Sequence, residues 1–168
     1  MHRCATSRRK PRTTSPTSSG DAPPMTANDL PESGATHIVR ASLKARLYRD
    51  IEIASTASLY DLGEAIVHSF EFDLDHAFGF FSKFSGNFYR SPVRYELLAD
   101  TGFQSESGSV RRTAVRKAFP SVGAKMLFLF DYGDEWRFKV EVIGLGEKMP
   151  KTDYPSPSYS SHSRPLSA

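Results

Sequence analysis

Residues 125–144 decide the fold of this chain, and they read Lys-Met-Leu-Phe-Leu-Phe-Asp-Tyr-Gly-Asp-Glu-Trp-Arg-Phe-Lys-Val-Glu-Val-Ile-Gly. Two runs rich in aromatic and aliphatic residues flank a short polar centre that contains Gly133 and Asp134. Apolar runs separated by a short Gly- and Asp-containing turn are typical of a β-hairpin. We therefore predict that these residues form two paired antiparallel strands.

The register of the hairpin follows from its side chains. A two-residue loop would pair Phe130 with Arg137 and place apolar residues opposite charged ones. A three- or five-residue loop pairs Phe130 with Trp136 and Phe128 with Phe138. Because a slip of one residue moves a whole apolar set to the other face, we predict the odd-length loop. One face then gathers Met126, Phe128, Phe130, Trp136, Phe138, Val140 and Val142, and the other holds Leu127 and Leu129 among charged residues.

Length, hydropathy and cysteine content limit the class of protein. A chain of 168 residues predicts one domain with room for tails. No apolar run approaches the ~20 residues that span a membrane, and the N-terminus has no apolar stretch typical of a secretory signal. The single cysteine, Cys4, excludes an internal disulfide framework and a cysteine-only metal site. We therefore expect a cytoplasmic protein with no membrane partner.

The basic charge of the chain belongs to its ends. Residues 1–24 carry five basic residues against Asp21 alone, whereas residues 25–154 have a net charge of −2. Residues 1–36 and 155–168 are rich in Ser, Thr and Pro, so we predict that both are disordered tails. The N-terminal basic run is either a nucleic-acid contact or a solvated tail, and it consists of Arg8, Arg9, Lys10 and Arg12.

The region between the tails, residues 37–154, shows strand and helix periodicities. Residues 37–48 alternate apolar and polar side chains, which predicts one strand. Ser58 is a suitable N-cap for a helix that ends near Phe70 and carries one apolar stripe. The other expected elements are strands at 76–84 and 93–98, a loop at 99–110 and a short helix within 110–119. Because strands and helices do not alternate regularly, we predict an α+β fold with a mainly antiparallel sheet packed on one main helix.

A first polar group lies on the predicted helix and in the loop after it. Glu64 and His68 are one helical turn apart, and Asp73, Asp75 and His76 follow in the loop. A carboxylate and an imidazole at this spacing can bind a divalent metal. The same pair also fits the solvent face of an amphipathic helix, because no second histidine completes a metal-binding pattern.

A second polar group lies at the tip of the predicted hairpin. Asp131, Asp134 and Glu135 stand close together in sequence beside Trp136. Clustered carboxylates can bind a cation or act in acid–base chemistry. They are equally suited to a turn, in which Gly133 would supply a positive φ and the charges would discourage edge aggregation.

The remaining motifs favour no known reaction. A basic cluster could contact phosphates or form a solvated face, and it contains Arg111, Arg112, Arg116 and Lys117. The chain contains no Walker-type phosphate loop, no dinucleotide fingerprint and no Gly-x-Ser-x-Gly elbow. The sequence therefore implies no cofactor.

Two stretches of the chain together carry a family resemblance. Residues 58–81 contain Asp75-His76-x-Phe78, and residues 130–136 read Phe-Asp-Tyr-Gly-Asp-Glu-Trp. These stretches resemble the plasmid pRiA4b ORF-3-like family, also called the insertion-element passenger family, across residues 36–154. The resemblance implies an α+β, roll-like domain that is often found near mobile elements. The passenger label sometimes includes a resolvase (TnpR-like) name, but no Tyr-x-Arg-x-Ser-like recombinase motif is present here.

Three functions follow as alternatives. The leading one is a non-enzymatic domain that acts as a protein or nucleic-acid interaction module associated with mobile DNA. The second is a metal-dependent or hydrolytic enzyme, which requires His76 and the hairpin tip to converge in one cleft. The third is a structural product without activity. The enzyme would use Asp75, His76, Asp131 and Asp134, and together with Trp136 these residues form the candidate polar cluster.

Overall fold

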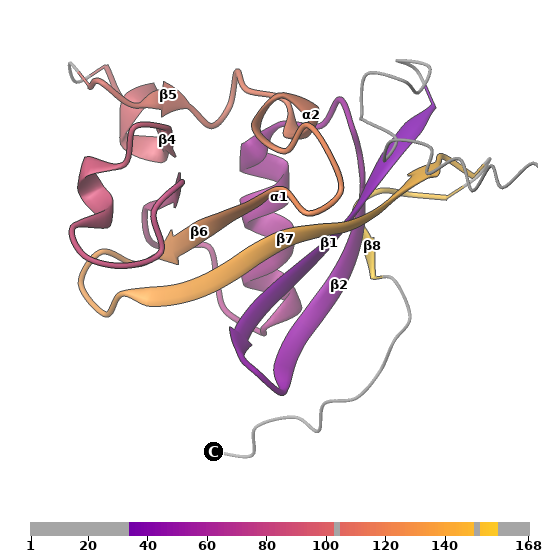
Figure 1. Ribbon diagram of the computed structural model, residues 1–168, viewed down its shortest axis with the longest axis horizontal. Helices are drawn as coiled ribbons and strands as arrows, with labels where there is room; N and C mark the ends of the chain where they lie inside the picture. The colour runs from indigo at the N-terminus through magenta and orange to yellow at the C-terminus, as the bar shows by residue number, and fades with distance from the viewer. Residues whose placement is uncertain (1–33, 103–104, 150–151, 158–168) are drawn as a thin grey trace, which may run out of the picture.

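The computed structural model describes residues 34–102, 105–149 and 152–157, and strands dominate it (Figure 1). The strands are β1 (Ala35–Lys44), β2 (Leu47–Ala54), β3 (Phe78–Phe81), β4 (Arg94–Glu96), β5 (Gly108–Ser109), β6 (Lys125–Phe130), β7 (Trp136–Glu147) and β8 (Ser156–Pro157). The helices are α1 (Leu59–Ser69) and the one-turn α2 (Val115–Ala118), with short 3-10 turns η2 (Phe88–Arg90) and η3 (Leu97–Asp100). In the described part of the chain, no helix is long and apolar enough to cross a membrane.

All eight strands belong to one sheet with the order β5-β4-β3-β6-β7-β1-β2-β8. Every neighbouring pair is antiparallel except β4 and β5, which run parallel. The predicted mainly antiparallel sheet is therefore confirmed. The 125–144 stretch lies at its middle, because β6 pairs with β3 and β7 pairs with β1.

The β6–β7 hairpin has the predicted register. Phe128 pairs with Phe138 and Phe130 pairs with Trp136, so five residues form the loop. Six of the seven residues predicted to face the core are buried, and Trp136 is the exception at 37% exposed. Trp136 stands at the end of the hairpin, where its ring packs against Phe72 rather than inside the core.

Helix α1 begins where the sequence predicts it. Ser58 accepts a hydrogen bond from the Asp61 backbone N–H, and the Asp61 carboxylate accepts one from the Ser58 N–H, which completes a capping box. The helix lies behind β6 and β7 in Figure 1. Its buried side chains share one core cluster with the inward residues of β1, β2, β3, β6 and β7, and they are Leu59, Leu62, Ile66 and Val67.

The other face of the sheet divides into an apolar part and a charged part. Near β3, the side chains of Phe81, Leu127 and Leu129 are buried under Phe88 of η2. Further along, the strand registers align a row of alternating charge across four strands, because Lys125 pairs with Glu141, Glu141 with Arg40, and Arg40 with Asp50. The guanidinium of Arg40 donates two hydrogen bonds of 2.7 Å to the Asp50 carboxylate. A row of paired charges suits a face that meets water.

The prediction of one strand over residues 37–48 is wrong. The chain turns at Ala45 and Arg46 and returns as β2, which runs through Arg49 and Asp50. A bulge between Ser42 and Lys44 keeps odd-numbered residues on the inner face both before and after the turn. The alternation of apolar and polar residues therefore continues through the turn, and the sequence pattern does not reveal where the chain reverses.

Other boundaries also differ from those predicted. The strand expected at 76–84 is limited to β3, and Phe84, near the end of the expected strand, is 41% exposed. The ladder with β4 ends at Ser82, whose N–H still donates to the Val93 carbonyl, whereas the Val93 N–H donates to the Ser82 hydroxyl. At the ends, β1 starts at residue 35, inside the predicted tail, and β8 lies after residue 155. Residues 1–33 and 158–168, which include Arg8, Arg9, Lys10 and Arg12, lie outside the described residues.

Candidate functional site

The tip of the β6–β7 hairpin is built by Asp131. Its backbone has a φ of 58°, and its Oδ1 accepts a hydrogen bond of 2.8 Å from the Gly133 N–H. The Glu135 N–H then donates to the Asp131 carbonyl at 2.7 Å, and Glu135 also has a positive φ, 52°. The expectation that Gly133 supplies the positive φ is wrong, because the side-chain bond of Asp131 stabilises the left-handed conformation at that residue instead.

The loop between α1 and β3 brings His76 to this tip. Pairing of Phe78 with Phe130 aligns the two segments, and the Asp131 N–H donates to the Ala77 carbonyl at 3.1 Å. As a result, His76 Nε2 lies 3.7 Å from Asp131 Oδ2, although the residues are far apart in sequence. On its other side, His76 Nδ1 lies 2.7 Å from Asp75 Oδ1. The structure thus brings together three of the five residues of the predicted polar cluster.

The charges of this site favour a protonated imidazole. The hydrogen bond to Asp75 raises the pKa of His76, and the negative charges of Asp131, Asp75 and Asp134 add to that shift. In return, the hydrogen bond from His76 lowers the pKa of Asp75. His76 and Asp75 are 51% and 64% exposed, whereas the Asp131 carboxylate is only 16% exposed. Asp131 is therefore partly shielded while its neighbours remain open to a partner.

Aromatic side chains lie next to the charged residues of the hairpin tip. The Trp136 ring lies 5.0 Å from the Phe72 ring, and the edge of His76 meets Phe130 with centroids 6.1 Å apart. Phe72 is half-buried, so Trp136 offers the more accessible apolar surface at the tip. A half-exposed indole beside carboxylates is a surface suited to a cationic group.

Glu64 and His68, the possible metal-binding pair of the predicted helix, do not lie at the hairpin tip. Glu64 and His68 lie on α1, and His68 borders a separate pocket next to β2. Asp73 is exposed and stands before the His76 segment. Within residues 34–102, 105–149 and 152–157, no group of three or more His, Cys, Asp and Glu side chains is arranged to hold a metal ion.

The predicted basic cluster is partly engaged within the fold. The Arg111 guanidinium stacks 3.8 Å above the Tyr60 ring, which fixes it against α1. Arg116 and Lys117 belong to α2 rather than to a continuous basic face. The structure therefore distributes these residues over a turn and a helix.

Sequence reasoning missed a buried histidine. His37 is fully buried, with Nδ1 2.8 Å from Ser55 Oγ and Nε2 2.9 Å from the Phe119 carbonyl. The Phe119 carbonyl can only accept, so Nε2 carries a proton, and in the neutral ring Nδ1 then accepts from the Ser55 hydroxyl. Burial lowers the pKa of His37. The alternation of apolar and polar residues, with Val39 two positions on, predicts that His37 points inward. It does not predict the hydrogen-bond partners of His37.

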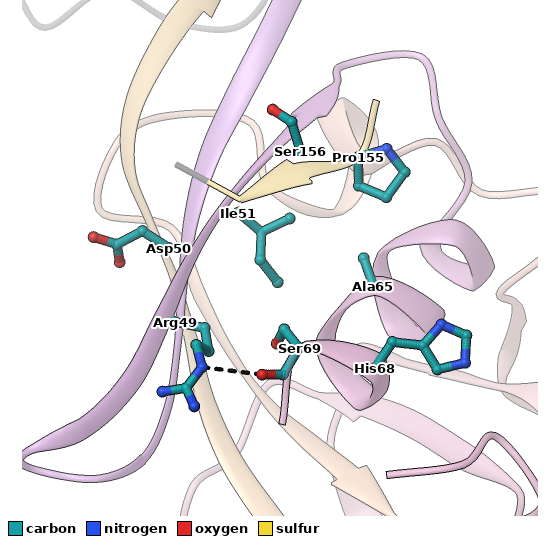
Figure 2. A pocket seen from close by; sticks show the side chains of 8 residues that line it. All are labelled: Arg49, Asp50, Ile51, Ala65, His68, Ser69, Pro155 and Ser156. Carbon is teal, nitrogen blue, oxygen red and sulfur yellow. Dashed lines mark hydrogen bonds between the residues drawn. The ribbon is translucent and has the colours of Figure 1, made fainter. Parts of the chain in front are cut away.

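The pocket next to β2 was also missed (Figure 2). It has a volume of about 370 Å³ and lies between β2, α1 and the segment around β8. Ile51, Ala65 and Pro155 border it, and the Arg49 Nε donates to the Ser69 carbonyl at 3.0 Å along one side. No sequence motif marks this space, because its walls come from three distant segments.

Comparison with known proteins identifies the family. The family model described as plasmid pRiA4b ORF-3-like protein matches residues 36–165. The chain belongs to the plasmid pRiA4b ORF-3-like family. The predicted resemblance is therefore confirmed, and the matched residues include both segments of the hairpin-tip site. No functionally curated protein matches the chain.

A solved structure agrees with the fold. The crystal structure of MM3350, a protein of unknown function from Methanosarcina mazei Go1, superposes with a TM-score of 0.61 at 17% sequence identity. The match covers 75% of this chain and 69% of that protein. At this identity the similarity shows a shared fold, and it assigns no activity to this member of the pRiA4b ORF-3-like family.

Proposed function

We propose that this pRiA4b ORF-3-like domain is a non-enzymatic interaction module whose hairpin tip binds a cationic side chain of a protein partner. The observation that carries the proposal is the convergence of Asp75, His76 and Asp131 beside the half-exposed Trp136. The negative charge of Asp134 adds to the raised pKa of His76. Carboxylates attract a lysine or arginine, and the indole face adds a cation–π contact worth about 0.5–1 kcal/mol at an exposed site.

The charge balance of the tip favours a protein segment over a nucleic acid. Asp75, Asp131 and Asp134 repel phosphates at any distance shorter than the Debye length, about 8 Å at physiological salt. The stronger candidate for a nucleic-acid contact is the N-terminal basic run, which lies outside the described residues. Deletion of residues 1–33, which ends before β1, should therefore abolish any salt-sensitive DNA or RNA binding of the full chain. Binding that survives the deletion would contradict the acidic tip as the functional surface.

The test of cation binding is calorimetric titration of the full chain with a peptide of alternating lysine and glycine. We expect saturable binding that weakens with salt, and no binding of the matched glutamate–glycine peptide. Asp75→Asn and Asp134→Asn should each weaken binding about two- to fivefold, as for exposed ion pairs. Glu147→Gln removes the same charge at the far end of β7 and serves as the control. Equal losses in all three variants would reject the tip as the site.

The wider setting of the module is part of the same proposal. We place it in the cytoplasm, because the one cysteine of the chain offers no disulfide framework. The plasmid origin in the family's description supports an association with mobile DNA. The α+β, roll-like arrangement on one main helix gives the hairpin a rigid base from which the tip projects.

A second candidate function is a metal-dependent or hydrolytic enzyme. One observation favours it, namely the 3.7 Å approach of His76 to Asp131, with Asp75 on the other ring nitrogen. Its test is elemental analysis of the purified chain, together with thermal melts before and after a chelator. Stoichiometric metal and a lowered melting temperature would support this candidate, and their absence would leave the carboxylates to the cationic partner.

A further inference from the structure

The loop that joins β6 to β7, residues 131–135, is held from outside as well as from within. Asp131 and Glu135, at its two ends, both have a positive φ, 58° and 52°. A non-glycine residue in this conformation persists only where its surroundings hold it there. The Gly133 N–H stabilises Asp131 from within the loop. Other side-chain contacts link the loop to the outer face of the sheet, which is the face without α1.

The side chain of Tyr132 reaches from this loop across β3 to β4. Its hydroxyl donates a hydrogen bond of 2.7 Å to Glu96 Oε1. Between the two residues lies Gly79 of β3, which pairs with Leu129 of β6 on one side and with Glu96 of β4 on the other. The ring packs on the buried apolar cluster of this face, which includes Phe81. Burial and the bond to Glu96 raise the pKa of Tyr132, so the hydroxyl keeps the proton that it donates.

Gly79 provides the space for this crossing. A Cβ atom at position 79 would lie 2.9 Å from the Tyr132 hydroxyl oxygen and 3.0 Å from Glu96 Cγ. Contacts this short would force a neighbour to move. A glycine inside a strand often marks the close approach of another group, and here that group is the phenol of Tyr132. The absent side chain of Gly79 and the bond between Tyr132 and Glu96 therefore support the same arrangement independently.

The other end of the loop is held by Tyr89 of η2. Its hydroxyl donates a hydrogen bond of 3.0 Å to Glu135 Oε1, and the Arg137 guanidinium bonds the same carboxylate. The Tyr89 ring also stacks on the Tyr132 ring, with centroids 6.1 Å apart and an angle of 24° between the planes. Because Tyr89 is 40% exposed whereas Tyr132 is half-buried, water competes more strongly for the bond of Tyr89. Tyr132 is therefore the firmer of the two anchors.

We propose that Tyr132 is a positioning residue of the hairpin tip, whose bond to Glu96 holds the loop in a single conformation. In that conformation Asp131 approaches His76, and Trp136 stands where the loop enters β7. The partner of the positioned loop is the cationic side chain of the proposed function, on which this part of the inference rests. A loop that samples other conformations binds such a partner less tightly, because apparent affinity falls with the fraction of the competent form.

Amide hydrogen exchange of the full chain tests the positioning without a ligand. The Glu135 N–H donates to the Asp131 carbonyl inside the loop, so its exchange rate reports how often the loop opens. Tyr132→Phe should speed exchange of this amide about fivefold, as for the loss of one hydrogen bond of ordinary strength. Tyr48→Phe, the same change on β2, should leave the rate unaltered. Unaltered exchange of the Glu135 amide in Tyr132→Phe would overturn the proposal.

Calorimetric titration with the lysine–glycine peptide tests the consequence for binding. Tyr132→Phe should weaken binding about three- to fivefold, although it removes no charge from the tip. Glu96→Ala removes the acceptor and should weaken binding equally, whereas Glu96→Gln removes the same charge, keeps an oxygen acceptor and should bind almost as the unchanged protein does. Combining Tyr132→Phe with Glu96→Ala should cause no further loss, because both changes break one bond. Additive losses, or equal losses in Glu96→Gln and Glu96→Ala, would overturn the proposal.

Gly79→Ala tests the same bond from β3. The added Cβ should displace the Tyr132 hydroxyl, so this variant should both weaken peptide binding and speed exchange of the Glu135 amide. Gly144→Ala, which adds a Cβ 3.3 Å from Ile38 Cδ1 on β7 away from the tip, should do neither. If the unchanged protein does not bind the peptide but Tyr132→Phe still speeds exchange of the Glu135 amide, the proposed function fails and the positioning by Tyr132 stands.

Discussion

Two histidines of this domain show what the same side chain does in opposite surroundings. His37 lies on β1, is fully buried, and makes both of its hydrogen bonds to uncharged groups, Ser55 and the Phe119 carbonyl. His76 lies at the hairpin tip, half-exposed between Asp75 and Asp131. Both ring nitrogens of His37 have hydrogen-bond partners inside the protein, so this residue stabilises the fold. His76 is surrounded by charge that remains accessible, so it belongs to a surface that can recognise a partner.

The largest expected difference between the two regions concerns packing. Phe119 is fully buried and its ring meets Phe80, so Phe119→Ala should cost about 3–5 kcal/mol of unfolding free energy. Trp136→Ala should cost clearly less, because 37% of Trp136 is already exposed. Urea unfolding of the two variants measures both values. Equal losses would mean that the tip is as much a part of the core as the His37 region.

The next expected effect concerns hydrogen bonding. His37→Phe keeps a ring in place but leaves Ser55 and the Phe119 carbonyl without their partner, which should cost about 1–3 kcal/mol for each unsatisfied group. His76→Phe should leave stability nearly unchanged, as is usual for an exposed site. The same denaturation experiment compares them. A larger loss at His76 would contradict its assignment to an open surface.

The pH dependence of stability should have opposite signs at the two residues. The pKa of His37 is lowered, so its contribution is complete above the unfolded value of 6.5 and is lost as the pH falls below that value. The pKa of His76 is raised, so its contribution is complete below 6.5 and is lost as the pH rises through the folded value. Proton titration of the two rings by NMR, with His37→Phe and His76→Phe for assignment, measures both shifts. If the pKa values of His37 and His76 were shifted in the same direction, the proposed difference between the two residues would be wrong.

The smallest effect on stability is expected at the exposed carboxylates. Asp75→Asn and Asp134→Asn should each leave the unfolding free energy nearly unchanged. Their effect should appear in peptide binding instead. Stability curves recorded beside the binding titrations separate the two, and a large stability loss would assign these residues to the fold rather than to recognition.

The sequence predicted those features that local chemistry determines. The hairpin register followed from placing Phe128 opposite Phe138, and the start of α1 followed from Ser58 and Asp61. The turn at residues 45–46 escaped prediction because a bulge preserved the alternation. The exposure of Trp136 depends on how far the core extends beneath the hairpin. The alternation of apolar and polar residues along the strands does not predict that distance.

The site was predictable as a set of residues and not as a geometry. The residue types of Asp75, His76, Asp131 and Asp134 indicate a polar site, but no sequence pattern shows that their side chains converge. The 3.7 Å approach of His76 to Asp131 depends on the pairing of β3 with β6, a contact between distant segments. The partners of His37 were unpredictable for the same reason, since Phe119 lies 82 residues further along the chain.

The most direct test of the central claim uses the fluorescence of Trp136, which is the only tryptophan of the chain and stands at the tip. Titration with the lysine–glycine peptide should shift its emission saturably, and about 1 M salt should abolish the shift, because exposed charges are then screened within about 3 Å. The glutamate–glycine peptide should have no effect. An emission spectrum that stays unchanged while calorimetry detects binding would place the partner elsewhere and contradict the tip as the recognition surface.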